Sequence, residues 1–516
     1  MKPPKSLYCF SFILSFLIYS CSAQRTTGLG TSVVDSLPVE KNNPKTAPII
    51  FKDPARSFRA VWIATVANID WPKNPNDSFE KMQQDYIDLL EFYKDLKFNA
   101  VILQLRAAGD AFYPTHLAPW SKYLTGKQGE NNKFNTDPLE WLIETTHQYG
   151  MDFHAWINPY RATMTRDTSL LSASHDFNKY PEWMVPYGSK YYYNPGLPKV
   201  QQHLIAIVQD IMKRYNIDGV HLDDYFYPYK TEGALFKDQK AFAQYSNGQV
   251  IDDWRRENIN RLIKGIHNTV KNEKPWISFG VSPFGVWKNK DTDPRGSQPR
   301  AGQTTFEDLY ADPLVWMEKG WIDYLAPQLY WSMDFAPASH KTLVNWWVKE
   351  KKKSNIYIGY GAYKIFNNSD PAWANPNEMI DQLTYGSKQS DISGQIIFSA
   401  KSLMQPSLQE VVTLLKKGPF HNWVLPPLSP LHPFNEGYPL EATIHEVSQE
   451  YFRVNVADPN ITKLVLYSTN ENNNLGEVVA ILPVHEGLAH IKNPKVTFIK
   501  GVNRYNELSN AVSIDK

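Results

Sequence analysis

Cysteine is almost absent from this chain of 516 residues, which contains only Cys9 and Cys21. We expect Cys9 to leave with an N-terminal export signal, so the mature chain has no pair of cysteines for an internal disulfide. An excess of charge of one sign is also absent, because the formal net charge is +1. The composition therefore gives no reason to expect nucleic acid or an anionic membrane surface as a partner.

Long hydrophobic runs are missing as well. The apolar stretch near the start, residues 7–18, is too short to span a bilayer as a stable helix. It follows Lys2 and Lys5, and this order predicts an export signal over residues 1–20. No later segment of the sequence is apolar enough to predict a membrane-spanning helix.

Residues 18–21, Ile-Tyr-Ser-Cys, resemble a bacterial lipobox, although Tyr19 is an unusual residue at its position. We expect Cys21 to be lipidated and the protein to be exported and lipid-anchored in the bacterial cell envelope, with the outer membrane favoured. This lipid is then the only expected membrane contact. The alternative is an ordinary cleaved signal peptide in which Cys21 is incidental. Residues 21–55 are rich in small and polar residues and predict a flexible tether.

Motifs of several enzyme classes are missing from the sequence. It has no P-loop and no G-x-S-x-G nucleophile elbow. His116, His154 and His221 form neither an H-x-H nor an H-E-x-x-H pair. We therefore expect neither a cofactor nor a metal site.

Apolar stretches of strand length alternate with longer helical patterns between residues 56 and 420. This number and span of alternations predict an α/β fold of the (β/α)8, or TIM, barrel type. An open doubly wound sheet is the alternative, but no Gly-rich phosphate loop follows the first strand. The predicted strands are residues 59–66, 100–106, 152–158, 219–223, 277–282, 324–329, 357–361 and 395–400. The clearest predicted helices are residues 78–96, 138–149, 199–215 and 252–271.

The pattern changes after the predicted barrel. Prolines gather in residues 421–434, which predicts a linker. Residues 435–516 contain short strand patterns without intervening helices, which predicts a small β-sandwich of the immunoglobulin or fibronectin type. A packing module is favoured over a sugar-binding one. The predicted strands are residues 442–445, 451–456, 463–467, 478–483, 489–491 and 495–500.

The strand over residues 219–223 ends in two adjacent carboxylates. Side chains alternate along a strand, so His221 and Asp223 share one face, and we expect that face to point into the barrel. Active sites of this fold lie at the carboxyl ends of the strands. Asp223 is therefore the first candidate catalytic residue, as nucleophile or as general base. Asp224 is the second, as an acid, as a ligand for a sugar hydroxyl, or as a cap of the following loop.

A further carboxylate is harder to place, and Asp110 and Asp334 are the candidates from loops. The same alternation places Gln104 and Arg106 inside the barrel, whereas the first and seventh strands give no clear direction. Aromatics are plentiful, and pyranose rings stack on aromatic faces, although core packing explains most of them. The predicted substrate-binding residues at strand ends are Arg106, Asn158, Tyr160, Arg161, His221, Tyr225, Tyr227, Trp287, Gln328, Tyr330 and Trp331.

Several of these strand-end motifs together resemble the glycosyl hydrolase-like family 10 of bacterial envelope lipoproteins. The resemblance implies a (β/α)8 glycosidase domain, and cleavage of peptidoglycan glycan strands as its activity. Residues 219–223 also resemble the fourth strand of α-amylase-type barrels, which implies a nucleophilic role for Asp223. The motifs are Arg-Ala-Val-Trp at 59–62, Asn-Ile-Asp-Trp-Pro at 68–72, Gln-Leu-Arg at 104–106, Trp-Ile-Asn-Pro-Tyr-Arg at 156–161, residues 218–228, Val-Ser-Pro-Phe-Gly at 281–285 and Ala-Pro-Gln-Leu-Tyr-Trp at 326–331.

The leading hypothesis is a glycoside hydrolase that cleaves a polysaccharide, with peptidoglycan-type N-acetylated glycan strands favoured. The chain departs from the α-amylase pattern, because the strand after Asp223 ends without a Glu. Retention, inversion and acetamido-assisted hydrolysis all stay open. The alternatives are a non-catalytic glycan-binding lipoprotein and a metal-dependent hydrolase.

Overall fold

The structure is a computed structural model that describes residues 49–516, apart from 132, 449, 471–473, 494 and 515–516. The predicted export signal, Cys21 and most of the predicted tether lie outside the described residues. Ile49–Lys516 form one compact unit. None of the helices in the described part of the chain has the length and apolar character needed to cross a bilayer.

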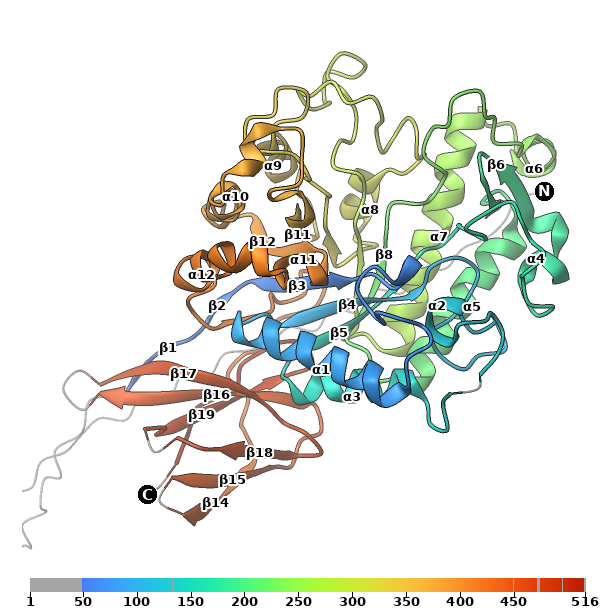
Figure 1. Cartoon of the computed structure of the whole chain (residues 1–516). Coiled ribbons are helices and arrows are strands. Elements are labelled where there is room, and N and C mark those ends of the chain that lie inside the picture. Colours follow the sequence, from blue (N-terminus) through green and yellow to red (C-terminus); the bar gives the residue numbers. More distant parts are fainter. Residues whose placement is uncertain (1–48, 132, 449, 471–473, 494, 515–516) are drawn as a thin grey trace, which may run out of the picture. The chain divides into compact units, whose positions relative to one another are not determined.

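Eight parallel strands close into a barrel, in the order β10-β11-β12-β3-β4-β5-β8-β9 (Figure 1). This closure confirms the predicted (β/α)8 fold, because an open sheet would leave two strand edges unpaired. The strands of the barrel are β3 (Phe58–Ile63), β4 (Ala100–Arg106), β5 (Asp152–Ile157), β8 (Gly219–Leu222), β9 (Ser278–Val281), β10 (Tyr324–Leu325), β11 (Asn355–Gly361) and β12 (Ile392–Phe398).

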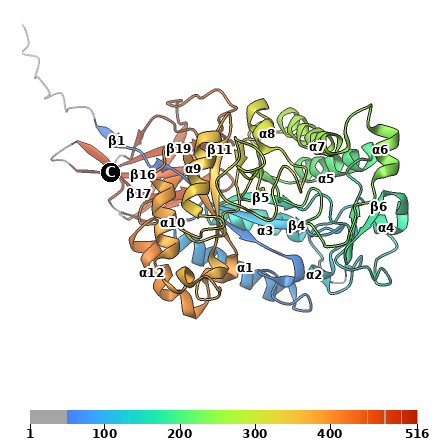
Figure 2. The same cartoon turned by 90° about the horizontal axis from the view of Figure 1, so that it is seen from above.

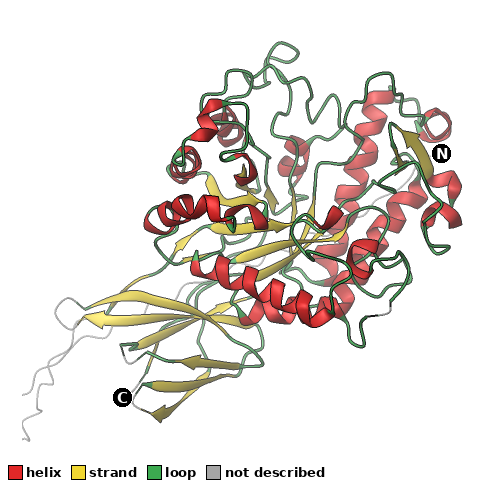
Figure 3. Ribbon diagram, in the orientation of Figure 1, coloured by secondary structure: helices red, strands yellow, loops and turns green. Residues whose placement is uncertain are grey.

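Helices surround the barrel (Figure 3), and α5 and α7 lie side by side against it (Figure 2). Helix α1 begins where the Ser78 hydroxyl accepts a hydrogen bond from the Lys81 amide, a common N-cap. The helices are α1 (Phe79–Asp95), α2 (Lys122–Thr125), α3 (Pro138–Gln148), α4 (Asp176–Lys179), α5 (Pro198–Arg214), α6 (Gln239–Tyr245), α7 (Ile251–Glu273), α8 (Pro313–Lys319), α9 (His340–Glu350), α10 (Glu378–Ser387), α11 (Ala400–Leu403) and α12 (Gln409–Lys417). A hairpin of β6 (Met184–Tyr187) and β7 (Lys190–Tyr193) precedes α5.

The alternation along each strand separates two buried layers. On β4, Val101, Leu103 and Leu105 pack into the layer between the strands and the helices. Ala100 and Ile102 instead pack inside the barrel. The interior layer also takes Phe58, Ala60 and Trp62 from β3 and Tyr357 from β11, which settles the two strands whose direction the sequence left open.

The inward direction predicted for Arg106 is wrong. The pairing of β4 with β5 shifts between Gln104 and Arg106, so the alternation is interrupted just before the strand ends. The Arg106 side chain is fully buried away from the barrel mouth, and its Nη2 donates to the Tyr193 hydroxyl at 3.0 Å. That hydroxyl donates in turn to Asp176, at 2.7 Å. Arg106 therefore links the end of β4 to Tyr193 and, through it, to Asp176 on the outside of the barrel.

The C-terminal strands form two sheets that pack face to face on a shared apolar core, as the predicted sandwich requires. The five-stranded sheet has the order β1-β17-β16-β19-β20, and the three-stranded sheet has the order β14-β15-β18. Their strands are β1 (Ile50–Lys52), β14 (Ala442–Ser448), β15 (Tyr451–Val456), β16 (Ile461–Asn470), β17 (Leu475–Pro483), β18 (Leu488–Ile491), β19 (Phe498–Asn503) and β20 (Val512–Ser513).

Strand β1 comes from the segment predicted to be a flexible tether. It pairs in parallel with β17 at the edge of the five-stranded sheet, and Phe51 packs against Tyr467 and Phe498. Strand β2 (Ala55–Arg56) pairs in parallel with β13 (Val424–Leu425) of the predicted linker. The described end of the predicted tether, from residue 49 on, is therefore part of the fold. Neither strand shows the apolar alternation that identifies a strand in sequence.

Candidate functional site

A cavity of about 330 Å³ opens at the carboxyl ends of the barrel strands. This is the end at which (β/α)8 barrels carry their chemistry. Five of its lining residues were predicted as site residues together with Asp223, namely Arg161, Asp224, Tyr225, Gln328 and Tyr330. The other lining residues are Trp62, Ala64, Val66, Ile69, Gln104, Trp156, Tyr229, Ser282, Tyr363 and Phe398.

Asp223 follows β8 directly and is 4% exposed. Its Oδ2 accepts hydrogen bonds from Trp156 Nε1 at 3.2 Å and from Asn158 Nδ2 at 3.1 Å. Its Oδ1 is buried and has no hydrogen-bond partner among the described residues. A buried carboxyl oxygen without a partner is costly in a folded protein, and here it belongs to a cavity-lining residue. Asn158, predicted to bind substrate, contacts Asp223 and is not itself among the cavity-lining residues.

Asp224 lines the same cavity and has its own hydrogen-bond partners. The Tyr229 hydroxyl donates to Asp224 Oδ2, and the Gln328 side chain also forms a hydrogen bond with this carboxylate. Gln328 is itself oriented by a 2.9 Å hydrogen bond from its Nε2 to the carbonyl oxygen of Ser282. Tyr229 was not predicted, although it stands in the same aromatic loop as Tyr225.

Burial raises the pKa of both carboxyls. The pKa of Asp223 is raised to about 7, by desolvation first and by the neighbouring charge of Asp224 second. Desolvation raises the pKa of Asp224 to about 6, and the hydrogen bonds from Tyr229 and Gln328 oppose that rise. Between these two pH values the pair holds one proton, so it contains an acid and a carboxylate at the same time.

His221, which was predicted to bind substrate, lies beneath the cavity and is not among its lining residues. Its Nε2 accepts a hydrogen bond from Trp62 Nε1 at 3.1 Å, and its Nδ1 lies 3.0 Å from the Tyr324 hydroxyl. The indole N–H can only donate, so Nε2 is the unprotonated nitrogen. Desolvation, and then the charge of His154, lower the pKa of His221 well below its usual value. This neutral imidazole positions Trp62 and, through a 2.9 Å contact, Ser282.

Aromatic and cationic groups form the walls around the two aspartates. The guanidinium of Arg161 lies 4.8 Å from the centre of the Tyr225 ring, and its Nε donates to the Ala107 carbonyl at 2.9 Å. On the β11–β12 side, the Tyr330 ring stacks on Phe398 with a centroid distance of 6.1 Å. Tyr363, which is 41% exposed, meets both of these rings edge to face. The cavity thus combines apolar ring faces with charged hydrogen-bonding groups, a combination typical of small-molecule sites.

Four predicted substrate-binding residues lie away from this cavity. Trp287 is 1% exposed and stacks on Trp346 at 5.9 Å, so it has no free face for a sugar. Tyr160 and Tyr227 are buried in the layer between strands and helices. Trp331 packs on Phe284 at 5.6 Å. All four are explained by the large aromatic core that the composition also predicted.

The loop candidates for a further carboxylate are also outside the cavity. Asp110 is 2% exposed, and its Oδ1 accepts hydrogen bonds from the amides of Ala107 and Ala108, so it shapes its own loop. Asp334 is exposed and does not line the cavity. Among the cavity-lining residues that the structure describes, Asp223 and Asp224 are the two carboxylates.

Asp70 connects two of the loops that follow the barrel strands, next to the cavity. Its Oδ2 accepts a hydrogen bond from the Ala64 amide at 2.8 Å, and its Oδ1 accepts one from the Ser399 hydroxyl at 2.7 Å. These bonds join the loop after β3 to the loop after β12. Gln104 holds the same β3 loop through the amides of Thr65 and Val66. The lining of the cavity is thus fixed by buried polar contacts.

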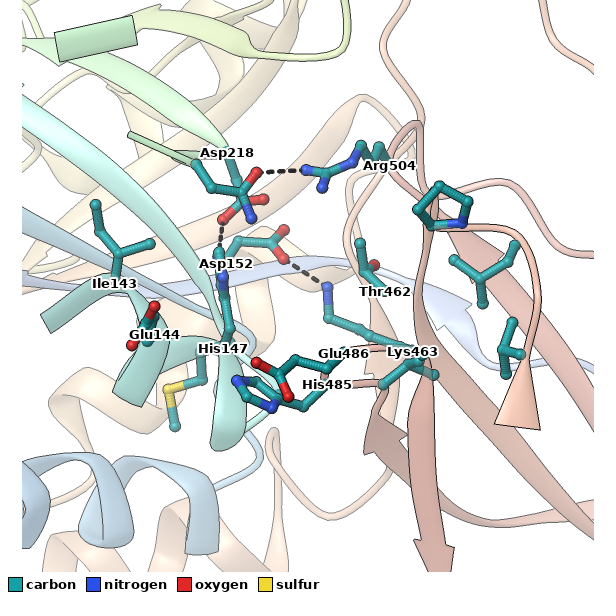
Figure 4. A pocket seen from close by; sticks show the side chains of 18 of the residues that line it. Ile143, Glu144, His147, Asp152, Asp218, Thr462, Lys463, His485, Glu486 and Arg504 are labelled. Atoms are coloured by element: carbon teal, nitrogen blue, oxygen red, sulfur yellow. Dashed lines mark hydrogen bonds and ion pairs between the residues drawn. The ribbon is translucent and has the colours of Figure 1, made fainter. Parts of the chain in front are cut away.

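A larger cavity of about 530 Å³ lies at the opposite end of the barrel, between the barrel base and the sandwich (Figure 4). Two close pairs of titratable groups lie in its lining: His147 with Asp218 at 2.7 Å and Lys463 with Asp152 at 2.5 Å. Arg504 donates to the Asn216 side chain at 2.7 Å. Size alone would favour this cavity, but paired charges at the amino ends of the strands indicate a structural junction.

Across the described residues, no three His, Cys, Asp or Glu side chains are grouped in a way that could hold a metal ion. The indole N–H of Trp156 and the side-chain amide of Asn158 bind Asp223 Oδ2, which leaves Oδ1 as the oxygen open to a ligand group that donates a hydrogen bond.

The sequence is similar to proteins described as glycosyl hydrolases. It is 46% identical over 353 residues to glycosyl hydrolase YngK of Bacillus subtilis (strain 168), covering 67% of this chain and 69% of that protein. It is 33% identical over 430 residues to glycosyl hydrolase DigH of Escherichia coli (strain K12), covering 78% of this chain and 94% of that protein. Among solved structures, the PgaB (BpsB) glycoside hydrolase domain from Bordetella bronchiseptica aligns with a TM-score of 0.44 at 13% identity, covering 70% of this chain and 99% of that one.

The family match covers the barrel strands up to β11. Residues 57–375 match the family described as glycosyl hydrolase-like 10, and this stretch contains both aspartates of the cavity. The chain therefore belongs to the glycosyl hydrolase-like 10 family.

Proposed function

We propose that this protein is a glycoside hydrolase that cleaves peptidoglycan-type N-acetylated glycan strands, with Asp223 and Asp224 as its catalytic residues. The observation that supports it best is the carboxyl pair itself. Two buried carboxyls with raised pKa values share a cavity at the barrel mouth, and one oxygen of Asp223 has no protein partner. Glycosidic bond cleavage needs an acid for the leaving oxygen, and a pair that shares one proton supplies it.

The cavity walls fit a sugar ring. Tyr330, Tyr363 and Phe398 offer ring faces and edges, while Arg161 and Gln328 offer hydrogen-bond donors on the acidic side. The preference for N-acetylated strands rests on the family resemblance of the strand-end motifs and on the predicted envelope location.

Cleavage is tested by incubating the purified mature chain with peptidoglycan strands stripped of their peptides, with chitin oligomers and with α-glucans. We expect new reducing ends from the first two substrates. Asp223→Asn should lower the rate by about 100-fold or more, because it removes the proton carrier. Asp334→Asn is the matched control, since that aspartate is exposed and outside the cavity. Glycan binding without cleavage, unchanged in Asp223→Asn, would favour the alternative of a non-catalytic glycan-binding protein.

We further propose that Cys21 carries a lipid that anchors the protein in the cell envelope. The lipobox-like residues 18–21 and the preceding apolar stretch support this proposal. Replacing Cys21 by Ser should move the protein from the detergent-soluble membrane fraction to the soluble fraction of the envelope. An unchanged distribution would favour the ordinary cleaved signal peptide.

A further inference from the structure

Asp223 and Asp224 are consecutive residues, and this limits what they can do together. Their Cα atoms are about 3.8 Å apart, as in any trans-linked pair. Both carboxyls come from the turn after β8 and therefore enter the cavity from one wall. Hydrolysis by two protein carboxylates instead needs groups on opposite faces of the sugar, either as acid and nucleophile or as acid and base.

The other walls supply no such group. Facing the aspartates are side chains of β3, the β11–β12 side and the loops after them. Within the described part of the lining, these walls carry aromatic, aliphatic, amide and hydroxyl side chains and no further carboxylate. They contain no thiol, because both cysteines of the chain precede residue 22. The group that attacks the anomeric carbon therefore has to come from water or from the substrate.

We propose that the 2-acetamido group of the bound sugar is the nucleophile, so that the substrate class is restricted to glycans with an N-acetylated sugar on the non-reducing side of the cleaved bond. This inference rests on the proposed hydrolase function and names the chemistry of that same site. One wall with two carboxyls is sufficient for such a reaction. One carboxyl protonates the leaving oxygen, and the other holds the amide N–H.

The contacts assign these two roles. Asp223 Oδ2 already accepts two N–H bonds, so its proton belongs on the partnerless Oδ1, which is then free to donate to the glycosidic oxygen. Asp224 accepts the Tyr229 hydroxyl, a bond that stabilises its charged form. The higher pKa of Asp223, about 7 against about 6 for Asp224, agrees with this placement of the proton.

The reaction then balances without any further reagent. In the first step the acetamido carbonyl oxygen bonds to C1, the bond from C1 to the glycosidic oxygen breaks, and the Asp223 proton passes to that oxygen. The product is a cyclic oxazolinium ion whose N–H is held by the Asp224 carboxylate. In the second step water attacks C1, Asp223 takes a proton from that water, and the ring opens to restore the acetamido group. Two displacements give net retention at C1.

The apolar loop after β3 completes the site. Ala64, Val66 and Ile69 line the cavity, and Ala64 and Ile69 belong to the same apolar cluster as Trp62. They offer an apolar surface for the methyl group of the acetamido substituent. A sugar with a free amine or a hydroxyl at C2 has no such methyl group. Discrimination then comes both from this contact and from the missing nucleophile.

The test uses the mature chain with aryl glycosides of chitobiose whose N-acyl group on the reacting sugar is acetyl, fluoroacetyl, difluoroacetyl or trifluoroacetyl. Fluorine weakens the carbonyl oxygen as a nucleophile and changes little else. We expect the cleavage rate to fall with each fluorine, by on the order of 100-fold over the series, because an oriented intramolecular nucleophile contributes more than this to the rate. Proton NMR of the first product should show retained configuration.

The outcomes separate the two levels of the proposal. If neither the acetyl compound nor stripped peptidoglycan is cleaved, the proposed function fails, and this inference with it. If the acetyl compound is cleaved and the rates are equal across the series, or the product is inverted, the proposed hydrolase function is retained and the acetamido nucleophile is wrong.

A separate experiment tests the roles assigned to the two aspartates. Asp223→Asn should retain more activity on dinitrophenyl than on methylumbelliferyl leaving groups, because the better leaving group needs no acid. Asp224→Asn should lose both activities equally, and Asp334→Asn should lose neither.

Discussion

At the scale of single residues, the two aspartates differ in what surrounds them. Asp223 has an oxygen without a partner, whereas Asp224 is bound by a hydroxyl and an amide. Desolvation raises the pKa of both carboxyls, and the charge of Asp224 raises that of Asp223 further, so Asp224 loses its proton first. Under the proposed mechanism, the pair supplies an acid and a carboxylate together only while it holds a single proton.

This condition predicts a narrow, bell-shaped pH dependence of kcat/KM. Below the pKa of Asp224, about 6, both carboxyls are protonated, and above the pKa of Asp223, about 7, both are charged. We expect the maximum between these values, with limbs that belong to the pair as a whole. Rates measured from pH 4 to 9 on a neutral substrate test this expectation. A plateau extending below pH 5 would contradict it.

Tyr229→Phe should move the acidic limb of that profile to higher pH. The lost hydroxyl stabilises the charged form of Asp224, so its removal raises the pKa of this carboxyl further. Tyr149→Phe is a matched control, because the Tyr149 hydroxyl bonds to Glu91 at the surface. An acidic limb that stays in place would show that Tyr229 only packs.

At the scale of the elements, alternation along strands predicted most of the barrel. Val101, Leu103 and Leu105 face the helices as expected, and Asp223 is at the mouth. The direction predicted for Arg106 is wrong because the pairing of β4 with β5 shifts just before β4 ends. The alternation in a single sequence contains no sign of such a shift. His221 has the expected direction but lies too deep, where Trp62 and Tyr324 satisfy it. Depth along a strand, unlike direction, depends on how neighbouring strands are staggered.

A titratable pair joins helix α3 to the start of strand β8. His147, in the last turn of α3, contacts Asp218, which directly precedes β8. Burial alone would lower the pKa of His147, but the charge and hydrogen bond of Asp218 outweigh it and raise that pKa. Burial likewise opposes ionisation of Asp218, and His147 still lowers its pKa to about 2.

These shifts predict a pH window for stability. The His147 contribution is complete below its unfolded pKa of about 6.5 and is lost as pH rises through the raised folded value. The Asp218 contribution is present above an unfolded pKa of about 3.9 and is lost as pH falls towards about 2. The melting temperature of the wild type should therefore exceed that of His147→Gln by the largest margin between these limits, near pH 5 to 6. A difference independent of pH would indicate that packing alone is responsible.

At the scale of the whole molecule, the sandwich is attached to the barrel through buried charge. Lys463 of β16 binds Asp152 at the start of β5, and the two side chains are 6% and 11% exposed. Burial raises the pKa of Asp152 and Lys463 opposes that rise. The sequence predicted both domains, but not this contact, since the two residues are far apart in the chain and neither stands in a motif.

Lys463→Met should destabilise the protein by about 3 kcal/mol near pH 7, because it leaves a buried carboxylate without its partner. Adding Asp152→Leu to the variant should restore most of the loss, since two packed apolar groups replace the ion pair. Urea unfolding of the single and double variants measures both effects. A double variant as unstable as the single one would place the loss in the Lys463 side chain itself.

Strand β1 determines where a pulling force would enter the protein. It is the first described strand and belongs to the sheet of the C-terminal sandwich, paired in parallel with β17. Under the proposed lipid anchor, tension between the membrane and a captured glycan would reach the edge of that sheet before it reached β3. Parallel neighbours pulled along their length resist by shearing all their hydrogen bonds together. The sandwich would then carry this load before the barrel does.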